Sequence, residues 1–153
     1  MRNFVVVIFT ASLLLPVFTA AHAQATLAPL ADRREAMNNL IHEYWNSYLE
    51  HDPEFASTIG DKRFNDKIPD YSVKAANDWL QREQGWLMQL GAIDPTGFND
   101  QEKISREMLL RRFTDDQEEA EYKPWEMPVN QMDGIQTEYA RLAPQLTFNS
   151  VKD

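Results

Sequence analysis

Apolar residues recur at helical spacing in the segment that begins at Asp32. They occupy positions i, i+3, i+4, i+7, i+8 and i+11, which share one face of an α-helix: Met37, Leu40, Ile41, Tyr44, Trp45 and Tyr48. Asp32 is a favoured residue type at an N-cap, and Glu35 completes a pair that is typical of a capping box. We therefore predict a helix that starts at Asp32 and buries this face.

Cap residues divide the next part of the chain into two more helices. Asp52 and Pro53 suit the N-cap and first position of a short helix, which Gly60 ends roughly two turns later. A polar loop then leads to Ser72, which suits the N-cap of a longer helix that ends at Gly91. One half of that helix is apolar: Val73, Ala76, Trp79, Leu80, Trp86, Leu87 and Leu90. Its opposite half is polar, which is typical of a helix packed on a core.

The turn-forming sequence 94–97 precedes a fourth helix, which begins near Asp100. Its apolar residues fall into two groups, with Ile104 and Met108 on one side and Leu109, Leu110 and Phe113 on the other. A helix that is apolar on two sides normally lies between layers. We therefore expect the side around Leu109, Leu110 and Phe113 to be exposed in this chain and to face a further layer of structure.

After the fourth helix the pattern becomes irregular around Trp125, and residues 133–142 predict a short helix that Pro144 ends. Residues 149–153 resemble the start of another helix, so we expect a truncated sequence; a frayed polar tail is the alternative. Strand-like alternation is not convincing anywhere after the first 23 residues. We predict an all-α segment of four to five helices, forming the N-terminal layer of a larger helical fold.

The first 23 residues have the features of a secretory signal peptide. Arg2 supplies the positive charge, residues 4–18 are almost wholly apolar, and Ala21 and Ala23 are the small residues that a signal peptidase reads. We predict cleavage after Ala23 and a periplasmic or secreted location for residues 24–153. The apolar run is shorter than the about 20 residues that span a bilayer, so we expect no stable membrane anchor. A retained anchor is the alternative.

The charge and cysteine content exclude several classes of partner and site. The sequence has 15 basic and 24 acidic residues, and loss of Arg2 with the signal peptide would make the formal net charge of −9 one unit more negative. This field repels phosphate backbones and anionic lipids, so we expect no nucleic-acid partner. Cysteine is absent, which removes disulfides, thiol nucleophiles and cysteine zinc sites.

The nearest approach to a zinc motif is His42-Glu43-Tyr44-Trp45-Asn46. A zinc-peptidase helix needs His at i and i+4, with Glu beside the first His as the general base. Here the second ligand position is Asn46, a poor zinc ligand, and His51 is out of phase with His42 on a helix. The serines also lack a nucleophile motif. We therefore predict no metal ligand and no catalytic residue in this chain.

Two other features each have a structural and a functional interpretation. The acidic run 115–121 lacks the spacing of a calcium-binding loop, so we expect a solvated helix end or loop, with cation binding as the alternative. Trp45, Trp79 and Trp86 lie on apolar helix faces, which favours core packing over ligand stacking. Trp125 lies in an irregular segment, where it either packs in a loop or lines a cleft.

Short motifs occur along the chain from about Met37 to Asp153. They are Tyr44-Trp45 through Asp52-Pro53, then Gly60-Asp61, Ile68-Pro69-Asp70, Ala92-Ile93-Asp94 and Pro128-Val129-Asn130-Gln131-Met132. Their order and spacing resemble the N-terminal part of the bacterial domain-of-unknown-function 885 family, whose members look like exported zinc peptidases.

The resemblance implies a longer helical, metallopeptidase-like protein that carries a His-Glu zinc helix in its C-terminal half. No residue here matches those ligands, so we expect zinc in the full-length parent and no cofactor in this chain. By analogy, this segment would shape a cleft for a peptide-like substrate, would pack against the downstream part of the same fold and would be inactive alone. The alternative is a complete small periplasmic binding or interaction module without catalytic activity.

Overall fold

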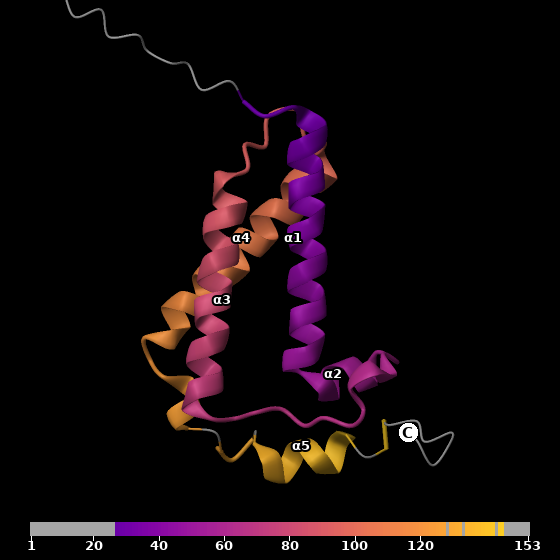
Figure 1. Cartoon of the computed structure of the whole chain (residues 1–153). Coiled ribbons are helices and arrows are strands. Elements are labelled where there is room, and N and C mark those ends of the chain that lie inside the picture. The colour runs from indigo at the N-terminus through magenta and orange to yellow at the C-terminus, as the bar shows by residue number, and fades with distance from the viewer. Residues whose placement is uncertain (1–26, 128, 133, 143, 146–153) are drawn as a thin grey trace, which may run out of the picture.

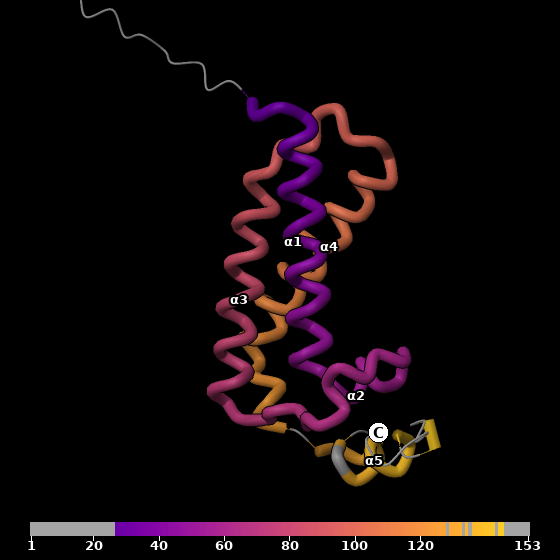
Figure 2. Tube along the Cα trace, turned by 45° about the vertical axis from the view of Figure 1, so that its right-hand side comes forward, coloured from indigo at the N-terminus to yellow at the C-terminus, as the bar shows by residue number. Residues whose placement is uncertain are grey.

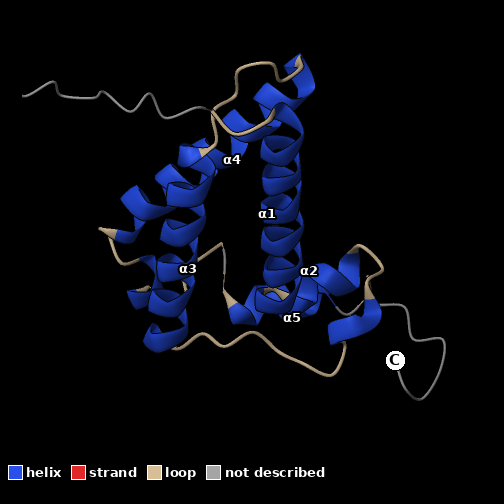
Figure 3. Ribbon diagram, turned by 45° about the horizontal axis from the view of Figure 1, so that its top comes forward, coloured by secondary structure: helices blue, strands red, loops and turns tan. Residues whose placement is uncertain are grey.

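The computed structural model describes residues 27–127, 129–132, 134–142 and 144–145. The predicted signal peptide at 1–23 and the tail at 149–153 lie outside these residues. Within them the chain is helical and contains no strand (Figure 3), so the predicted all-α class is confirmed. The elements are α1 (Leu30–His51), α2 (Pro53–Thr58), η1 (Lys62–Phe64), α3 (Val73–Ala92), α4 (Asp100–Ala120), η2 (Pro124–Glu126) and α5 (Ile135–Leu142). None of the helices in this part of the chain has both the length and the apolar content that a bilayer span requires.

Three long helices, α1, α3 and α4, form a bundle (Figures 1 and 2). The most extensive packing is between α3 and α4, which are consecutive and joined by a short corner. The C-terminal end of α1, the start of α3 and the end of α4 all lie at the same end of the bundle (Figure 1). The short helices α2 and α5 also lie at this end (Figures 1 and 2). Segments distant in sequence are therefore brought together there.

The first helix begins earlier than predicted. Pro29 is its N-cap and makes no side-chain capping bond, so the predicted cap at Asp32 is wrong. The proline ring fixes φ, here at −50°, in the range that a helix start requires. Asp32 instead lies in the first turn, where a negative charge still favours the positive end of the helix dipole.

The caps predicted for the next two helices are confirmed. The Asp52 carboxylate accepts a hydrogen bond from the Phe55 amide at 2.9 Å, and Pro53 occupies the first helical position. The Ser72 hydroxyl accepts a bond from the Ala75 amide at 3.1 Å. These bonds satisfy amides that a helix start leaves unpaired, and they fix where each helix begins.

The core is aromatic where the three long helices meet. The Tyr44 ring of α1 packs edge-on against Trp86 of α3, with centroids 5.5 Å apart, and against Phe113 of α4, with centroids 5.1 Å apart. Both geometries are favourable because a ring edge is positive and a ring face is negative. Trp86 is 3% exposed and Phe113 is 0% exposed, so the prediction that Trp86 belongs to the core is confirmed.

Two predictions about apolar side chains need correction. Trp45 is 43% exposed and lies outside the core, where its ring contacts Tyr48 of its own helix and Phe55 of α2. On α4, Leu109, Leu110 and Phe113 pack on or in the core, whereas Ile104 and Met108 are exposed by 53% and 68%. The second apolar side of α4 is therefore the one that carries Ile104 and Met108.

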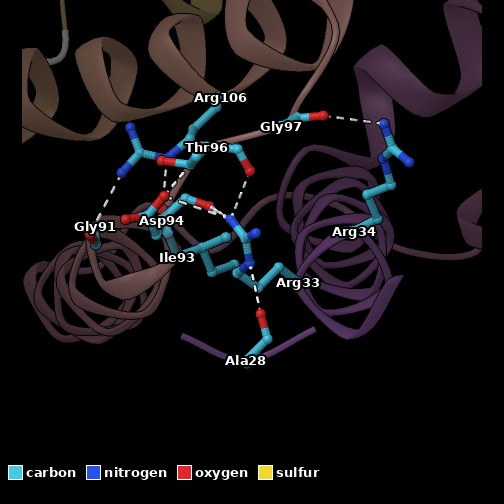
Figure 4. A network of polar contacts seen from close by, with 9 residues as sticks. All are labelled: Ala28, Arg33, Arg34, Gly91, Ile93, Asp94, Thr96, Gly97 and Arg106. Carbon is cyan, nitrogen blue, oxygen red and sulfur yellow. Dashed lines mark hydrogen bonds and ion pairs between the residues drawn. The ribbon is translucent and has the colours of Figure 1, made fainter. Parts of the chain in front are cut away.

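Arg33 ties α1 to the corner between α3 and α4 (Figure 4). Its guanidinium donates to the backbone carbonyls of Asp94 and Thr96, the latter at 2.9 Å, and to that of Ala28 at 2.9 Å. Only 12% of the side chain is exposed, so these bonds replace water that the guanidinium would otherwise bind. Arg106 of α4 donates to the carbonyl of Ile93 at 3.1 Å from the other side (Figure 4). Two arginines therefore fix the path of this corner.

Replacing Arg33 with Ala is expected to lower the free energy of unfolding by about 2 kcal/mol or more, because hydrogen bonds to a charged donor are lost at a site with little access to water. The matched control is Arg111→Ala, since the Arg111 side chain is 81% exposed and pairs only with a neighbour on its own helix. Its loss should stay within about 0.5 kcal/mol. Urea denaturation of both variants measures the difference, and equal losses would show that the corner does not depend on Arg33.

Candidate functional site

A pocket of about 230 Å³ lies at the end of the bundle where α1 ends and α3 begins. It is formed by His51 of α1, by Ala76, Trp79, Leu80 and Glu83 of α3, by Arg112, Asp116, Glu119 and Ala120 of α4, and by Pro124 and Trp125. A water molecule occupies about 30 Å³ in the liquid, so the pocket has room for an organic group. It is the strongest candidate for a binding site among the described residues.

Helical spacing brings the pocket side chains together. On α3, Ala76, Trp79 and Glu83 lie at i, i+3 and i+7, which is one face of the helix. On α4, Arg112 and Asp116 are separated by one turn, and their side chains pair at 2.6 Å. A polar bond connects the two helices, since the Gln117 side-chain amide donates to a backbone carbonyl of α3 at 3.0 Å.

Glu83 is the unusual residue of this site. It is 1% exposed, and neither carboxyl oxygen accepts a hydrogen bond of normal geometry from another described residue. Burial raises the pKa of the Glu83 carboxyl to about 8, and the adjacent Asp116 carboxylate acts in the same direction through its negative charge and through a hydrogen bond that protonated Glu83 can donate to it. The Trp79 indole and the Arg112 guanidinium oppose these effects without cancelling them. At neutral pH, Glu83 therefore holds a proton.

The walls of the pocket are largely aromatic. His51 stacks on Trp79, with ring centroids 4.2 Å apart and planes 11° apart. Burial lowers the pKa of the His51 imidazole, which favours its neutral form. Trp125 supplies a further aromatic side chain from the segment after α4, the position where the sequence allowed either a packed loop or a cleft wall. The pocket thus combines aromatic surface with an unpartnered acid.

The residues of the near-zinc motif do not form a metal site. His42 is exposed, and the Asn46 amide oxygen accepts two bonds from the Arg63 guanidinium, each 3.2 Å long. His51 lies in the pocket, stacked on an indole. Across the described ranges, no group of three or more His, Asp or Glu side chains is placed to hold a metal ion. These residues therefore do not fit the zinc that the family resemblance implies.

The acidic run is part of α4 as far as Ala120, so its helical interpretation is confirmed for those residues. Asp115 and Asp116 each pair with an arginine one turn earlier, at 3.2 and 2.6 Å. Sequence reasoning did not identify Glu83 as a candidate. The sequence does contain one indication of the site: Glu83 is an acidic residue on the face of α3 that also carries Trp79 and Trp86.

The burial of Glu83 makes stability depend on pH in a defined direction. The pKa of Glu83 is about 8 in the folded state, above the usual 4.5, so the native state holds more protons than the unfolded state between these values. Stability should therefore fall as pH rises from about 4.5 to about 8. In Glu83→Gln this contribution disappears, and the variant should be more stable than the wild type at pH 8 by about 1–3 kcal/mol.

Urea denaturation at several pH values measures this effect. Glu118→Gln is the matched control, because Glu118 is exposed on α4 and does not line the pocket. The control should keep the pH dependence of the wild type. The same slope in Glu83→Gln and in the wild type would contradict the assignment of a proton to Glu83.

Comparison with known proteins gives one match. The sequence model of the family described as "Bacterial protein of unknown function (DUF885)" matches residues 53–153. The match begins at Pro53, so α1 lies before it, whereas the motifs led us to expect the resemblance to start near Met37. No curated protein and no solved structure matches the chain. Because the family model covers more than half of the sequence, the chain belongs to this family of bacterial proteins of unknown function.

Proposed function

We propose that this chain is the part of an exported peptidase-like hydrolase that shapes the cleft for a peptide-like substrate. The observation that carries the proposal is the pocket at the end of the bundle, where the aromatic side chains of Trp79 and Trp125 lie beside the unpartnered carboxyl of Glu83. Aromatic surface with a few polar groups is typical of sites that bind organic ligands.

The chemistry of the pocket favours binding over catalysis. A hydrolytic site needs a nucleophile or a metal-bound water together with a base in hydrogen-bonding reach. Among the residues that line this pocket there is no Ser, Thr or Cys, and the polar neighbours of Glu83 there, Asp116, Trp79 and Arg112, offer no nucleophile that it could activate. Zinc, which the resemblance assigns to the parent protein, would have to be held by residues outside the described part of this chain.

The proposal also places this segment against a larger body. Ile104 and Met108 lie one turn apart on α4 and are exposed by 53% and 68%. An apolar pair on the side of a helix opposite its core is typical of a surface that packs against another layer. The periplasmic or secreted location expected from residues 1–23 remains part of the proposal, because peptide substrates are available there.

The test is peptide binding by the purified full chain. Peptides that carry a free amino terminus, a lysine and a fluorescent label at the carboxyl end should bind saturably, as measured by anisotropy, and mass spectrometry should show them intact. Trp125→Ala should weaken binding by about tenfold, the effect expected when an aromatic anchor is truncated. Trp45→Ala is the matched control, because Trp45 is exposed on α1 and does not line the pocket.

Three results would contradict the proposal. They are hydrolysis of the peptides by the chain alone, tight stoichiometric zinc binding measured by elemental analysis, and equal affinities of the Trp125→Ala and Trp45→Ala variants. Absence of peptide binding would also exclude a substrate cleft and would favour the simple binding module.

A further inference from the structure

The two oxygens of Glu83 accept no hydrogen bond of normal geometry from the described residues. A buried carboxyl that accepts no hydrogen bond costs free energy when ionised, so such groups in native proteins commonly mark a ligand position. Glu83 lines the pocket and is 1% exposed, and its polar neighbour there is another carboxylate, Asp116. A cationic donor that displaces the Glu83 proton would therefore find carboxylate oxygens that no protein donor occupies.

The charges around the pocket favour a cation over an anion. Three acidic side chains line it, Glu83, Asp116 and Glu119, against a single arginine. That arginine, Arg112, already pairs with Asp116 at 2.6 Å, so its charge is largely balanced. Ionised Glu83 would leave an excess of negative charge, which attracts a positive group.

The aromatic walls favour an organic cation over a metal ion. Hard cations take 6–8 oxygen ligands or keep a shell of water, and the described residues offer no group of three metal ligands. Trp79 and Trp125 instead present indole rings, whose faces attract ammonium groups. The volume of about 230 Å³ also accommodates an alkyl chain.

We propose that this pocket binds a primary ammonium group carried on a short aliphatic chain, with the Glu83 carboxylate as its counter-ion and Trp79 and Trp125 as its walls. A lysine side chain and the amino terminus of a peptide both offer this chemistry. The inference rests on the proposed function, since it names the group of a peptide-like substrate that the pocket recognises.

Binding is coupled to the loss of one proton. In the empty pocket Glu83 is a neutral acid, and when the ammonium enters, the acid proton leaves to solvent while the ammonium keeps its own. The other titratable groups near Glu83 are Tyr44 and His51 from α1 and Arg112, Asp116 and Glu119 from α4. Burial raises the pKa of Tyr44 and lowers that of His51, so both stay neutral near pH 7. Glu83 is therefore the group that exchanges the proton.

The experiment is calorimetric titration of the full chain with n-butylammonium in two buffers that differ in ionisation enthalpy. We expect saturable binding with release of about one proton at pH 7, because the Glu83 pKa of about 8 keeps it protonated beforehand. Affinity should rise by up to about tenfold per pH unit below pH 8. Neutral n-butanol and anionic butyrate should not bind.

Substitution locates the effect. Glu83→Gln should weaken n-butylammonium binding by about tenfold or more, because the counter-ion is lost. Glu118→Gln, the exposed control on α4, should leave binding unchanged. If Glu83→Gln does not fold, the comparison of butylammonium with butanol on the wild type decides alone. Absence of saturable butylammonium binding, equal binding of butanol or butyrate, or unchanged affinity in a folded Glu83→Gln variant would overturn the inference.

Two capped lysine derivatives distinguish the sources of the ammonium group. One keeps only the side-chain amine and the other keeps only the α-amine, and the tighter ligand identifies which group the pocket takes. Failure of this inference is distinguishable from failure of the proposed function. In the first case N-acetylated, lysine-free peptides would bind as tightly as peptides with free amines, whereas in the second case butylammonium would bind and no peptide would.

Discussion

Aromatic packing at the junction of α1, α3 and α4 is the constraint on which the other features depend. Tyr44 of α1 contacts Trp86 of α3 and Phe113 of α4 edge-on, so a single ring packs against both of the other long helices. Trp79 continues the same aromatic face two turns earlier on α3, with its ring centroid 5.6 Å from that of Trp86. Glu83 lies between these two tryptophans in sequence, so packing of the tryptophans removes its carboxyl from water.

This arrangement places a strongly perturbed acid in a pocket that has no partner for catalysis. Perturbed acids often mark functional sites, but structural burial has the same effect on a pKa. The pocket favours a functional role here, because Glu83 lines it and its oxygens accept no hydrogen bond of normal geometry from the described residues. A binding role explains both the free oxygens and the aromatic walls.

Local sequence chemistry predicted the helices well because caps and apolar periodicity act over a few residues. Asp52 and Ser72 cap as expected, and α4 has a full capping box at Asn99 and Glu102 that follows the same rules. The exposure of Trp45 could not be predicted, because periodicity places it on the same face as Tyr44 and Tyr48 and does not specify which part of that face the other long helices cover.

The site could be predicted only in part. Trp125 was a candidate for a cleft because prolines flank it in sequence, and it does line the pocket. The roles of Glu83 and His51 depend on contacts between different helices. Sequence separation does not specify such contacts, and the segment between these two residues includes a loop whose path cannot be predicted from periodicity. The one indication in the sequence was that Glu83 is an acidic residue on the apolar face of α3.

The hydrogen bonds that Arg33 donates to the corner between α3 and α4 also affect which substitutions the chain can tolerate. Arg33 donates to the backbone carbonyls of Ala28, Asp94 and Thr96. These bonds depend on the path of the main chain and not on the identity of the side chains. Position 94 is constrained by its side chain as well, because the Asp94 carboxylate accepts a bond from the Thr96 amide at 2.7 Å and pairs with Arg33 at 3.4 Å. Gly97 is also constrained, because its φ is +85° and an added Cβ would lie 3.2 Å from Leu30. Among homologues, variation at 96 beside constancy at 33, 94 and 97 would be the evolutionary record of this contact.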